Sequence, residues 1–309
     1  FHLRHNARLY YSIARKLNNG FIRNNFFVKE ISERDIEKKL FFFNKDSYNK
    51  KIIETVENLD PVIIILGHCS KINFKTLEYI NKFHPNIKIA QWYVDSLIPT
   101  GPDYDAHLKT FNKYIDFIDC SFVTSDPLSL KFNKNNKNIF YIPNPSDLSI
   151  DNLKVDQISN NIYDMFIALS HGQHRATLKR FYKDEREEFI LNLQNKLPDI
   201  IFDTYGIDKS QPVWGNKYYK RLSQSKMALN LSRGLPFKWY SSDRISSFIP
   251  NGIATFVDRA TKLDDFFSDD EVVFYKNINE LGNLINELKN NDKKRRSIGQ
   301  KGRIKYNTH

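Results

Sequence analysis

The chain has 309 residues, of which 40% are hydrophobic and 27% charged, so one large or two medium domains with buried cores are expected. Its net charge of +11 favours anionic partners such as nucleic acid, lipid headgroups or phosphorylated substrates. It contains no zinc-binding or RNA-recognition motif and no apolar run near the ~20 residues of a membrane span, which excludes those nucleic-acid modules and an apolar spanning helix.

The first half of the chain alternates predicted helices and strands. Apolar residues at helical spacing predict a helix over 7–19 that ends at Gly20, and the apolar run 26–28 is consistent with a strand. The β-branched run 62–66 has the continuous apolar pattern of a central parallel strand. Further elements are predicted at 74–83, 87–93, 118–124 and 139–142. Because the chain starts at Phe1 without a Gly-rich first loop, we expect a first strand to be missing.

Two polar residues directly follow predicted strands of this half. His68 follows the strand at 62–66, and Asp95 follows the strand at 87–93. Ligands of doubly wound sheets bind beyond the carboxyl ends of the strands, which places both residues at a candidate cleft. Either residue could act as a general base there, and either could be an ordinary loop residue.

A break at Pro143–Ser146 is the predicted interdomain hinge, and a second α/β set begins with the strand 163–169. In the loop after that strand, Gly172 would let the backbone approach a phosphate, and Arg175 would supply bidentate donors to a diphosphate. The alternative is a polar turn with a surface arginine. Two nearby histidines have no further ligands in sequence reach, so no metal site is predicted.

The stretch 226–258 is predicted to fold as strand, polar loop, capped helix, Gly stop and strand. Ser242 and Asp243 are N-cap residues ahead of an apolar helical pattern, and Gly252 suits the left-handed position that ends it. A helix start of this kind, with Arg244 beside it, is an anion site. The alternative is an ordinary crossover with a solvated arginine.

This stretch also resembles a known family. Ser242, Arg244, Ser247 and Gly252 fall on the pattern S-x-R-x-x-E-x-x-A-x-G, and Lys226 and Asn230 fall on S-K-x-x-L-N. Both patterns are similar to the C-terminal half of GT-B glycosyltransferases, especially the CgeB-like and related group 1 enzymes. The resemblance covers about residues 210–305. Ser247 stands where many relatives carry a Glu that contacts the ribose or donor sugar, which leaves donor and stereochemistry open.

The resemblance implies an α/β, GT-B fold in which two Rossmann-like domains face each other across a cleft. Residues 1–145 would form the acceptor domain, 146–290 the nucleotide-sugar domain, and 291–309 a helix that crosses back. The implied activity is a metal-independent transfer of a hexosyl or related sugar. The implied donor site comprises Gly172, Arg175, Lys226, Asn230, Ser242, Asp243, Arg244 and Ser247, and either Asp95 or His68 would activate the acceptor hydroxyl.

The expected partners are a nucleotide sugar and a saccharide or lipid-linked acceptor of surface polysaccharide or lipopolysaccharide, with no cofactor and no nucleic acid. Two cysteines without disulfide or metal spacing indicate the cytoplasm, and a peripheral contact with the inner face of the membrane stays open. A nucleotide-sugar epimerase of the same fold and a non-catalytic nucleotide-binding module remain alternatives.

Overall fold

The chain divides into two units, Phe1–Pro143 and Asn144–His309. The structure, a computed structural model, describes residues 12–33, 36, 47–67, 69–101, 103–130, 138–169, 185–207 and 210–308. The division falls inside the Pro143–Ser146 segment that the sequence predicts as a hinge.

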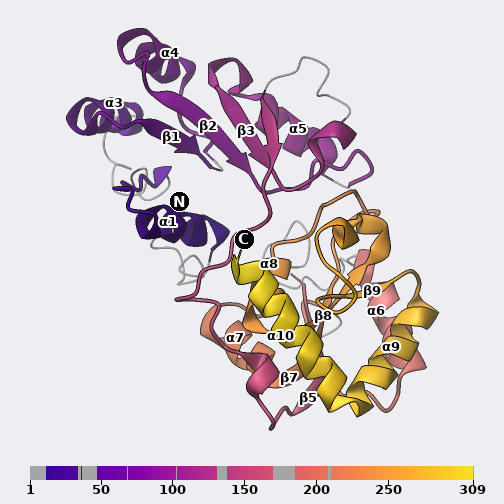
Figure 1. Ribbon diagram of the computed structural model, residues 1–309. Helices are drawn as coiled ribbons and strands as arrows, with labels where there is room; N and C mark the ends of the chain where they lie inside the picture. The colour runs from indigo at the N-terminus through magenta and orange to yellow at the C-terminus, as the bar shows by residue number, and fades with distance from the viewer. Residues whose placement is uncertain are drawn as a thin grey trace. The chain divides into compact units, whose positions relative to one another are not determined.

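Unit 1 contains a parallel sheet in the order β1-β2-β3-β4. Helices α3 and α4 pack against one of its faces through a shared apolar cluster, in which Ile52 and Leu77 meet Ile89 of β2 (Figure 1). The strands are β1 (Ile63–Leu66), β2 (Lys88–Tyr93), β3 (Cys120–Val123) and β4 (Ile139–Tyr141). The helices are α1 (Ile13–Arg23), α3 (Ser47–Leu59), α4 (Phe74–Phe83) and α5 (Tyr104–Asn112), with 3-10 turns η2 (Ile115–Phe117) and η3 (Pro127–Ser129).

Three predictions for the start of unit 1 are wrong. Strand β1 lies at an edge of the described sheet and not at its centre, and Val62 just before it is 83% exposed. Helix α1 continues through Gly20 to Arg23, since a glycine weakens a helix without ending it. The predicted strand at 26–28 is an irregular segment in which Phe27 is 84% exposed. In both strand predictions the apolar residues are partly exposed, so apolar composition alone does not indicate burial.

Unit 2 contains a parallel sheet in the order β6-β5-β7-β8-β9. The chain adds β6 on one side of β5 and then crosses to the other side to form β7. The strands are β5 (Tyr163–Ala168), β6 (Phe202–Tyr205), β7 (Ser225–Asn230), β8 (Ala254–Asp258) and β9 (Val273–Tyr275). The helices are α6 (Glu185–Lys196), α7 (Gly215–Ser223), α8 (Ile245–Phe248), α9 (Ile278–Asn290) and α10 (Asp292–Thr308), with 3-10 turns η5 (Val155–Gln157), η7 (Ile249–Asn251), η8 (Arg259–Thr261) and η9 (Leu263–Asp265).

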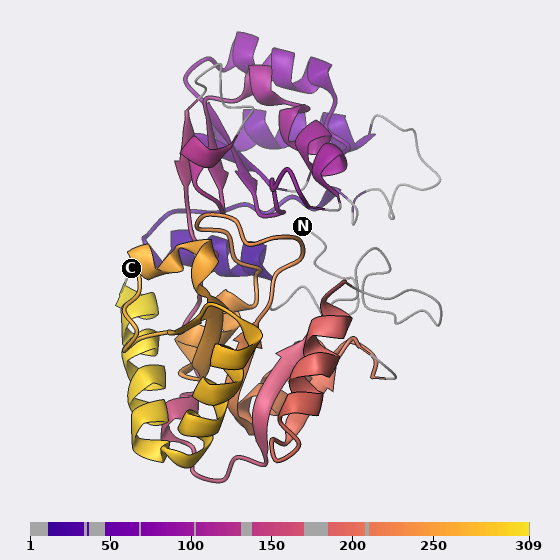
Figure 2. The same cartoon turned by 90° about the vertical axis from the view of Figure 1, so that its right-hand side faces the viewer.

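Helices cover both faces of the unit 2 sheet because alternate residues of each strand point to opposite sides. On β5, Met165 and Ile167 belong to the core that includes α6 and α9, while Phe166 packs with Leu222 of α7 and Phe248 of α8. Figure 2 shows α9 and α10, in yellow, lying next to each other. This two-sided arrangement confirms a doubly wound α/β unit.

Helix α10 packs on unit 2 through glycines. A Cβ built on Gly299 would overlap the carbonyl oxygen of Gly252, and one on Gly302 would overlap that of Glu271. Gly252 itself has φ +78°, the left-handed conformation predicted for it. The end of α10 is fixed by the Tyr306 hydroxyl, which donates to the Asn144 carbonyl over 2.6 Å. The predicted separate segment 291–309 is thus part of unit 2, and its crossing back stays a prediction.

We expect Gly299→Ala to destabilise unit 2 although alanine favours helix formation. The added methyl group would have to displace backbone, so the free energy of unfolding should fall by about 1–3 kcal/mol. Gly282→Ala on α9 is the matched control, because its Cβ would meet only the Leu197 side chain at 3.6 Å. Chemical denaturation followed by circular dichroism measures both. Equal stability of the two variants would contradict the close packing of α10.

Candidate functional site

The strand order of unit 2 defines where a ligand would bind. The chain leaves β5 toward β6 on one side and returns to β7 on the other, so β5 and β7 flank the topological switch point. Loops that leave the carboxyl ends of such strands diverge and open a crevice. The loop after β5 includes Gly172 and Arg175, which lie outside the described residues, so their roles stay predictions. The loop after β7 is described and begins at Leu231.

Side-chain hydrogen bonds fix the loop after β7. Asn230, the last residue of the strand, donates from Nδ2 to Ser241 Oγ and accepts from Ser242 Oγ, each over 2.8 Å. The amide of Ser242 donates to Ser232 Oγ over 3.0 Å. These hydrogen bonds join the two ends of the loop at the carboxyl edge of the sheet. The loop itself contains no strand or helix that could hold its ends together.

Two arginine side chains converge beside this loop. Arg244 donates from Nη2 to the Leu231 carbonyl over 2.5 Å, and Arg186 of α6 donates from Nη1 to the same oxygen over 3.2 Å. Arg186 is buried, with 5% of its surface exposed. Both guanidinium groups thus lie at the carboxyl end of β7, next to the switch point.

The arginine pair is electrostatically unfavourable in isolation. Burial and then the charge of Arg186 lower the pKa of Arg244 below its ordinary value, and Asp243 partly offsets this. Within the described ranges, no carboxylate lies within ion-pair distance of Arg244, and its buried Nε has no hydrogen-bond partner. Since arginine stays protonated at neutral pH, the site holds positive charge that an anion would neutralise.

The N-caps predicted for the helix after this loop are wrong, and the anion site predicted beside Arg244 stays a prediction. Helix α8 has only four residues, its N-cap is Arg244, and that cap makes no side-chain hydrogen bond. Ser242 bonds to Asn230 instead of capping the helix, and Asp243 is exposed. Ser247 lies on α8, where its carbonyl accepts from Asn251 over 2.8 Å. The positive charge here comes from guanidinium groups and not from a helix dipole.

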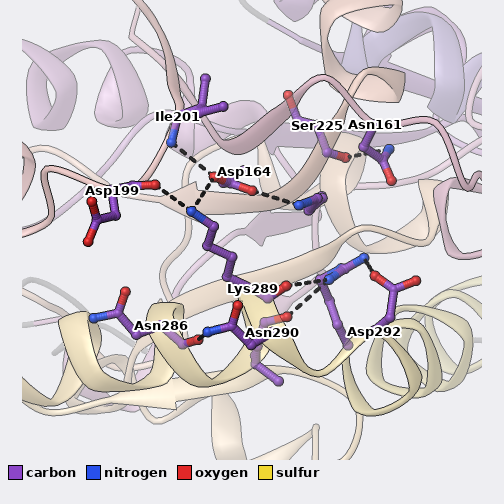
Figure 3. Close-up of polar contacts among 12 residues, drawn as sticks. Asn161, Asp164, Asp199, Ile201, Ser225, Asn286, Lys289, Asn290 and Asp292 are labelled. Atoms are coloured by element: carbon purple, nitrogen blue, oxygen red, sulfur yellow. Dashed lines mark hydrogen bonds and ion pairs between the residues drawn. The ribbon is translucent and has the colours of Figure 1, made fainter.

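Lys226 does not belong to this edge, which corrects the prediction that it binds a diphosphate. It lies at the amino end of β7, and its Nζ contacts Asp164 Oδ1 at 2.8 Å. Asp164 has two further partners, which Figure 3 shows. Lys289 Nζ forms an ion pair with Oδ2 at 3.3 Å, and the Ile201 amide donates a hydrogen bond to the same oxygen. Although burial alone would raise it, the bonds from Ile201 and Lys226 lower the pKa of Asp164. Lys226 therefore neutralises a buried carboxylate.

Unit 1 has a carboxylate at the carboxyl edge of its own sheet. Asp95 follows β2, and its Oδ2 lies 3.8 Å from His107 Nε2 of α5. The other ring nitrogen of His107 is 2.8 Å from the Ser96 carbonyl, so Nδ1 carries the hydrogen and Nε2 faces Asp95. The sequence reasoning missed His107. His68 lies outside the described residues, and its role stays a prediction.

Arg186 is the other residue that sequence reasoning missed. It lies in the first turn of α6, where the helix dipole disfavours a cation. A basic residue at a helix start, soon after the first strand of a second α/β set, is the signal that could have indicated it. Arg186 lies beside Arg244 because it bonds to the carbonyl of Leu231, which is 45 residues further along the chain. No local sequence pattern specifies such a contact.

The part of the chain that the structure describes contains no group of three or more His, Cys, Asp or Glu residues that could hold a metal ion. Within the same residues, no helix is long and apolar enough to cross a membrane.

Comparisons with known proteins agree with this architecture. The chain is similar to an alpha-glucosyltransferase in complex with UDP and a 13-mer DNA containing a central A:G mismatch, with TM-score 0.57 and 13% identity, over 93% of this chain and 90% of that chain. It is similar to TarM, with TM-score 0.54 and 15% identity over 84% of this chain and 55% of TarM, so it spans about half of TarM's length. Anabaena Alr3699/HepE in complex with UDP gives TM-score 0.52 and 12% identity over 84% and 77%.

At these identities the structural likeness establishes the fold, and it confirms the predicted GT-B architecture with two Rossmann-like domains. Residues 179–309 match a family model described as glycosyl transferase-like, which supports the resemblance seen in the sequence. The narrower CgeB-like assignment stays a prediction. No curated protein sequence matches the chain.

We expect Lys226→Met to lower stability, because it leaves the buried Asp164 with fewer partners. The loss should be about 1–3 kcal/mol, less than for a fully unpaired charge because Lys289 remains. The lowered pKa of Asp164 means that its contribution is present above the ordinary carboxyl range and is lost as pH falls through that lowered pKa. The difference between wild type and variant should therefore shrink in acid.

Thermal unfolding between neutral and acidic pH measures this difference. Lys301→Met is the control, because Lys301 forms an exposed ion pair with Asp270 that should contribute little. Unchanged stability of Lys226→Met at neutral pH would show that the pair with Asp164 is not structural.

Proposed function

We propose that the protein is a glycosyltransferase whose unit 2 binds the diphosphate of a nucleotide-sugar donor with Arg186 and Arg244. The observation that carries the proposal is the convergence of these two guanidinium groups at the carboxyl end of β7, beside the topological switch point. A diphosphate matches the pair in charge and can accept bidentate hydrogen bonds from each group. The GT-B fold and the UDP complexes of similar structures support a nucleotide as the ligand.

The arrangement fits the electrostatics of glycosyl transfer. When the bond between the anomeric carbon and the phosphate oxygen breaks, the bonding electrons leave with the diphosphate, and its negative charge increases. Preorganised cations at that position stabilise the transition state more than the ground state. Arg186 and Arg244 would supply this charge, which is why we propose a reaction without a resident metal. Insensitivity of turnover to EDTA is the corresponding expectation.

The acceptor must lose a hydroxyl proton as its oxygen bonds to the anomeric carbon. In unit 1, Asp95 with its neighbour His107 is the group we propose to receive that proton. We further propose a hexosyl or related donor sugar and an acceptor in surface polysaccharide or lipopolysaccharide assembly, at the cytoplasmic face of the envelope. These finer assignments follow the sequence resemblance alone.

Replacing either arginine should weaken nucleotide binding while the protein stays folded. Arg244→Met and Arg186→Met each remove one charge from the proposed diphosphate site, so we expect the Kd for UDP to rise about 10- to 100-fold. Titration calorimetry with UDP, GDP and ADP on each variant measures this and also identifies the preferred base.

Lys226→Met is the matched control, since it removes a cation from the same unit at the opposite end of β7. It should leave the UDP affinity of the folded protein unchanged. Wild-type affinity in both arginine variants, or no nucleotide binding by the wild-type chain, would refute the proposed function.

Asp95→Asn should reduce turnover without affecting donor binding. Because the amide cannot accept the proton, we expect UDP release from UDP-glucose, with water or an added acceptor sugar, to slow by about 100-fold or more. Asp105→Asn on α5 is the control, because this exposed carboxylate lies on the same helix as His107. Equal turnover of Asp95→Asn and wild type would exclude Asp95 as the base.

A further inference from the structure

Asn230 occupies the junction between β7 and the arginine site, where it can act in two ways. Sequence patterns alone allow it either to contact the donor or to satisfy the loop. We propose that Asn230 is a positioning residue: it does not contact the nucleotide sugar but fixes the loop that carries Arg244. This inference rests on the proposed function of the arginine pair.

Both ends of the Asn230 carboxamide are already engaged by the protein. Its Nδ2 donates to Ser241 Oγ and its Oδ1 accepts from Ser242 Oγ, each over 2.8 Å, and the residue is 5% exposed. One amide hydrogen and one lone pair of the carboxamide remain, but with only 5% of the residue exposed they have little access to a ligand. The geometry therefore assigns the carboxamide to the loop.

The loop needs such a tie because it lacks regular structure. Between the end of β7 and Ile245, the described backbone forms turns and irregular segments only. Asn144 adds a third bond, donating from Nδ2 to the Ser241 carbonyl over 3.3 Å, and Ser232 accepts from the Ser242 amide. These bonds place residues 241–242 against the end of β7.

The tie determines where Arg244 points. Arg244 lies two residues beyond Ser242, and the carbonyl it contacts belongs to Leu231, the residue after Asn230. Asn230 therefore fixes both the donor and the acceptor of that bond. Since the two cations repel each other, Arg244 would turn away from Arg186 once the loop is released. Preorganised donors bind a diphosphate more tightly than donors that must first be ordered.

A double-mutant cycle tests the proposal through the Kd for UDP, measured by calorimetry. We expect Asn230→Ala to raise the Kd about 10-fold in the wild-type background but less than about 2-fold in an Arg244→Met background, because the two residues act through one group. Ser242→Ala removes the hydrogen bond from Ser242 Oγ to Asn230 Oδ1. It should raise the Kd for UDP when Arg244 is present and change it little in the Arg244→Met background. It serves as the second variant if Asn230→Ala does not fold.

Asn161→Ala is the matched control at the opposite end of β7. The Asn161 side chain donates to the carbonyls of Ser223 and Ser225 and so joins a loop to the start of β7. Asn161→Ala therefore removes two hydrogen bonds, as Asn230→Ala does. It should leave the Kd for UDP unchanged. Amide hydrogen exchange tests the same role without UDP. The backbone amides of residues 241–244 should exchange faster in Asn230→Ala than in wild type, and at the wild-type rate in Asn161→Ala.

The outcomes separate the two proposals. If Asn230→Ala raises the Kd by the same factor with and without Arg244, or not at all in wild type, the positioning role is wrong while the arginine site stands. Unchanged exchange at 241–244 also contradicts it. If Arg244→Met binds UDP as wild type does, the positioning role is wrong. If Arg186→Met does so as well, or if the wild-type chain binds no nucleotide, the proposed function fails with it.

Discussion

Two guanidinium groups that share one carbonyl oxygen at the end of β7 are the feature on which the functional interpretation depends. Arg186 comes from the helix after β5 and Arg244 from the loop after β7, so the pair forms only because the chain switches sides of the sheet between those strands. Burying two like charges together is unfavourable unless something compensates them. The proposed function assigns that compensation at Arg244 to a bound anion.

The two ends of the same sheet show how a structural charge differs from a functional one. At the amino end, Asp164 is matched by Lys226 and Lys289 and by the amide of Ile201. Those charges are satisfied within the protein, and they hold β5, β6 and β7 to α9. At the carboxyl end, the described carboxylates do not pair with Arg244, and its Nε has no partner among the described residues. Basic side chains are therefore paired with a carboxylate at one end of β7, while Arg244 at the other end has no carboxylate partner among the described residues.

The loop that carries Arg244 depends on polar side chains because it can use neither a ladder of strand hydrogen bonds nor a helix. Small hydroxyl residues and one asparagine take that role, since their short side chains can bond to neighbouring loop groups without losing much rotamer entropy. Asn144, the first residue of unit 2, takes part in the same network, and α10 reaches it through Tyr306. The loop, the start of the unit and its last helix are thus one hydrogen-bonded assembly.

The sequence by itself determined the α/β class, the succession of strand, loop, helix and strand over residues 226–258, the left-handed turn at Gly252 and Arg244 as a candidate anion ligand. These follow from local periodicity and from backbone preferences that a residue carries with it. The tertiary structure decided that β1 lies at an edge of the described sheet, that Lys226 pairs with Asp164, and that Arg186 lies beside Arg244. Each of these depends on which distant segments become neighbours. Strand order and ion pairing arise from contacts across tens of residues, which the spacing of residues along the chain does not encode.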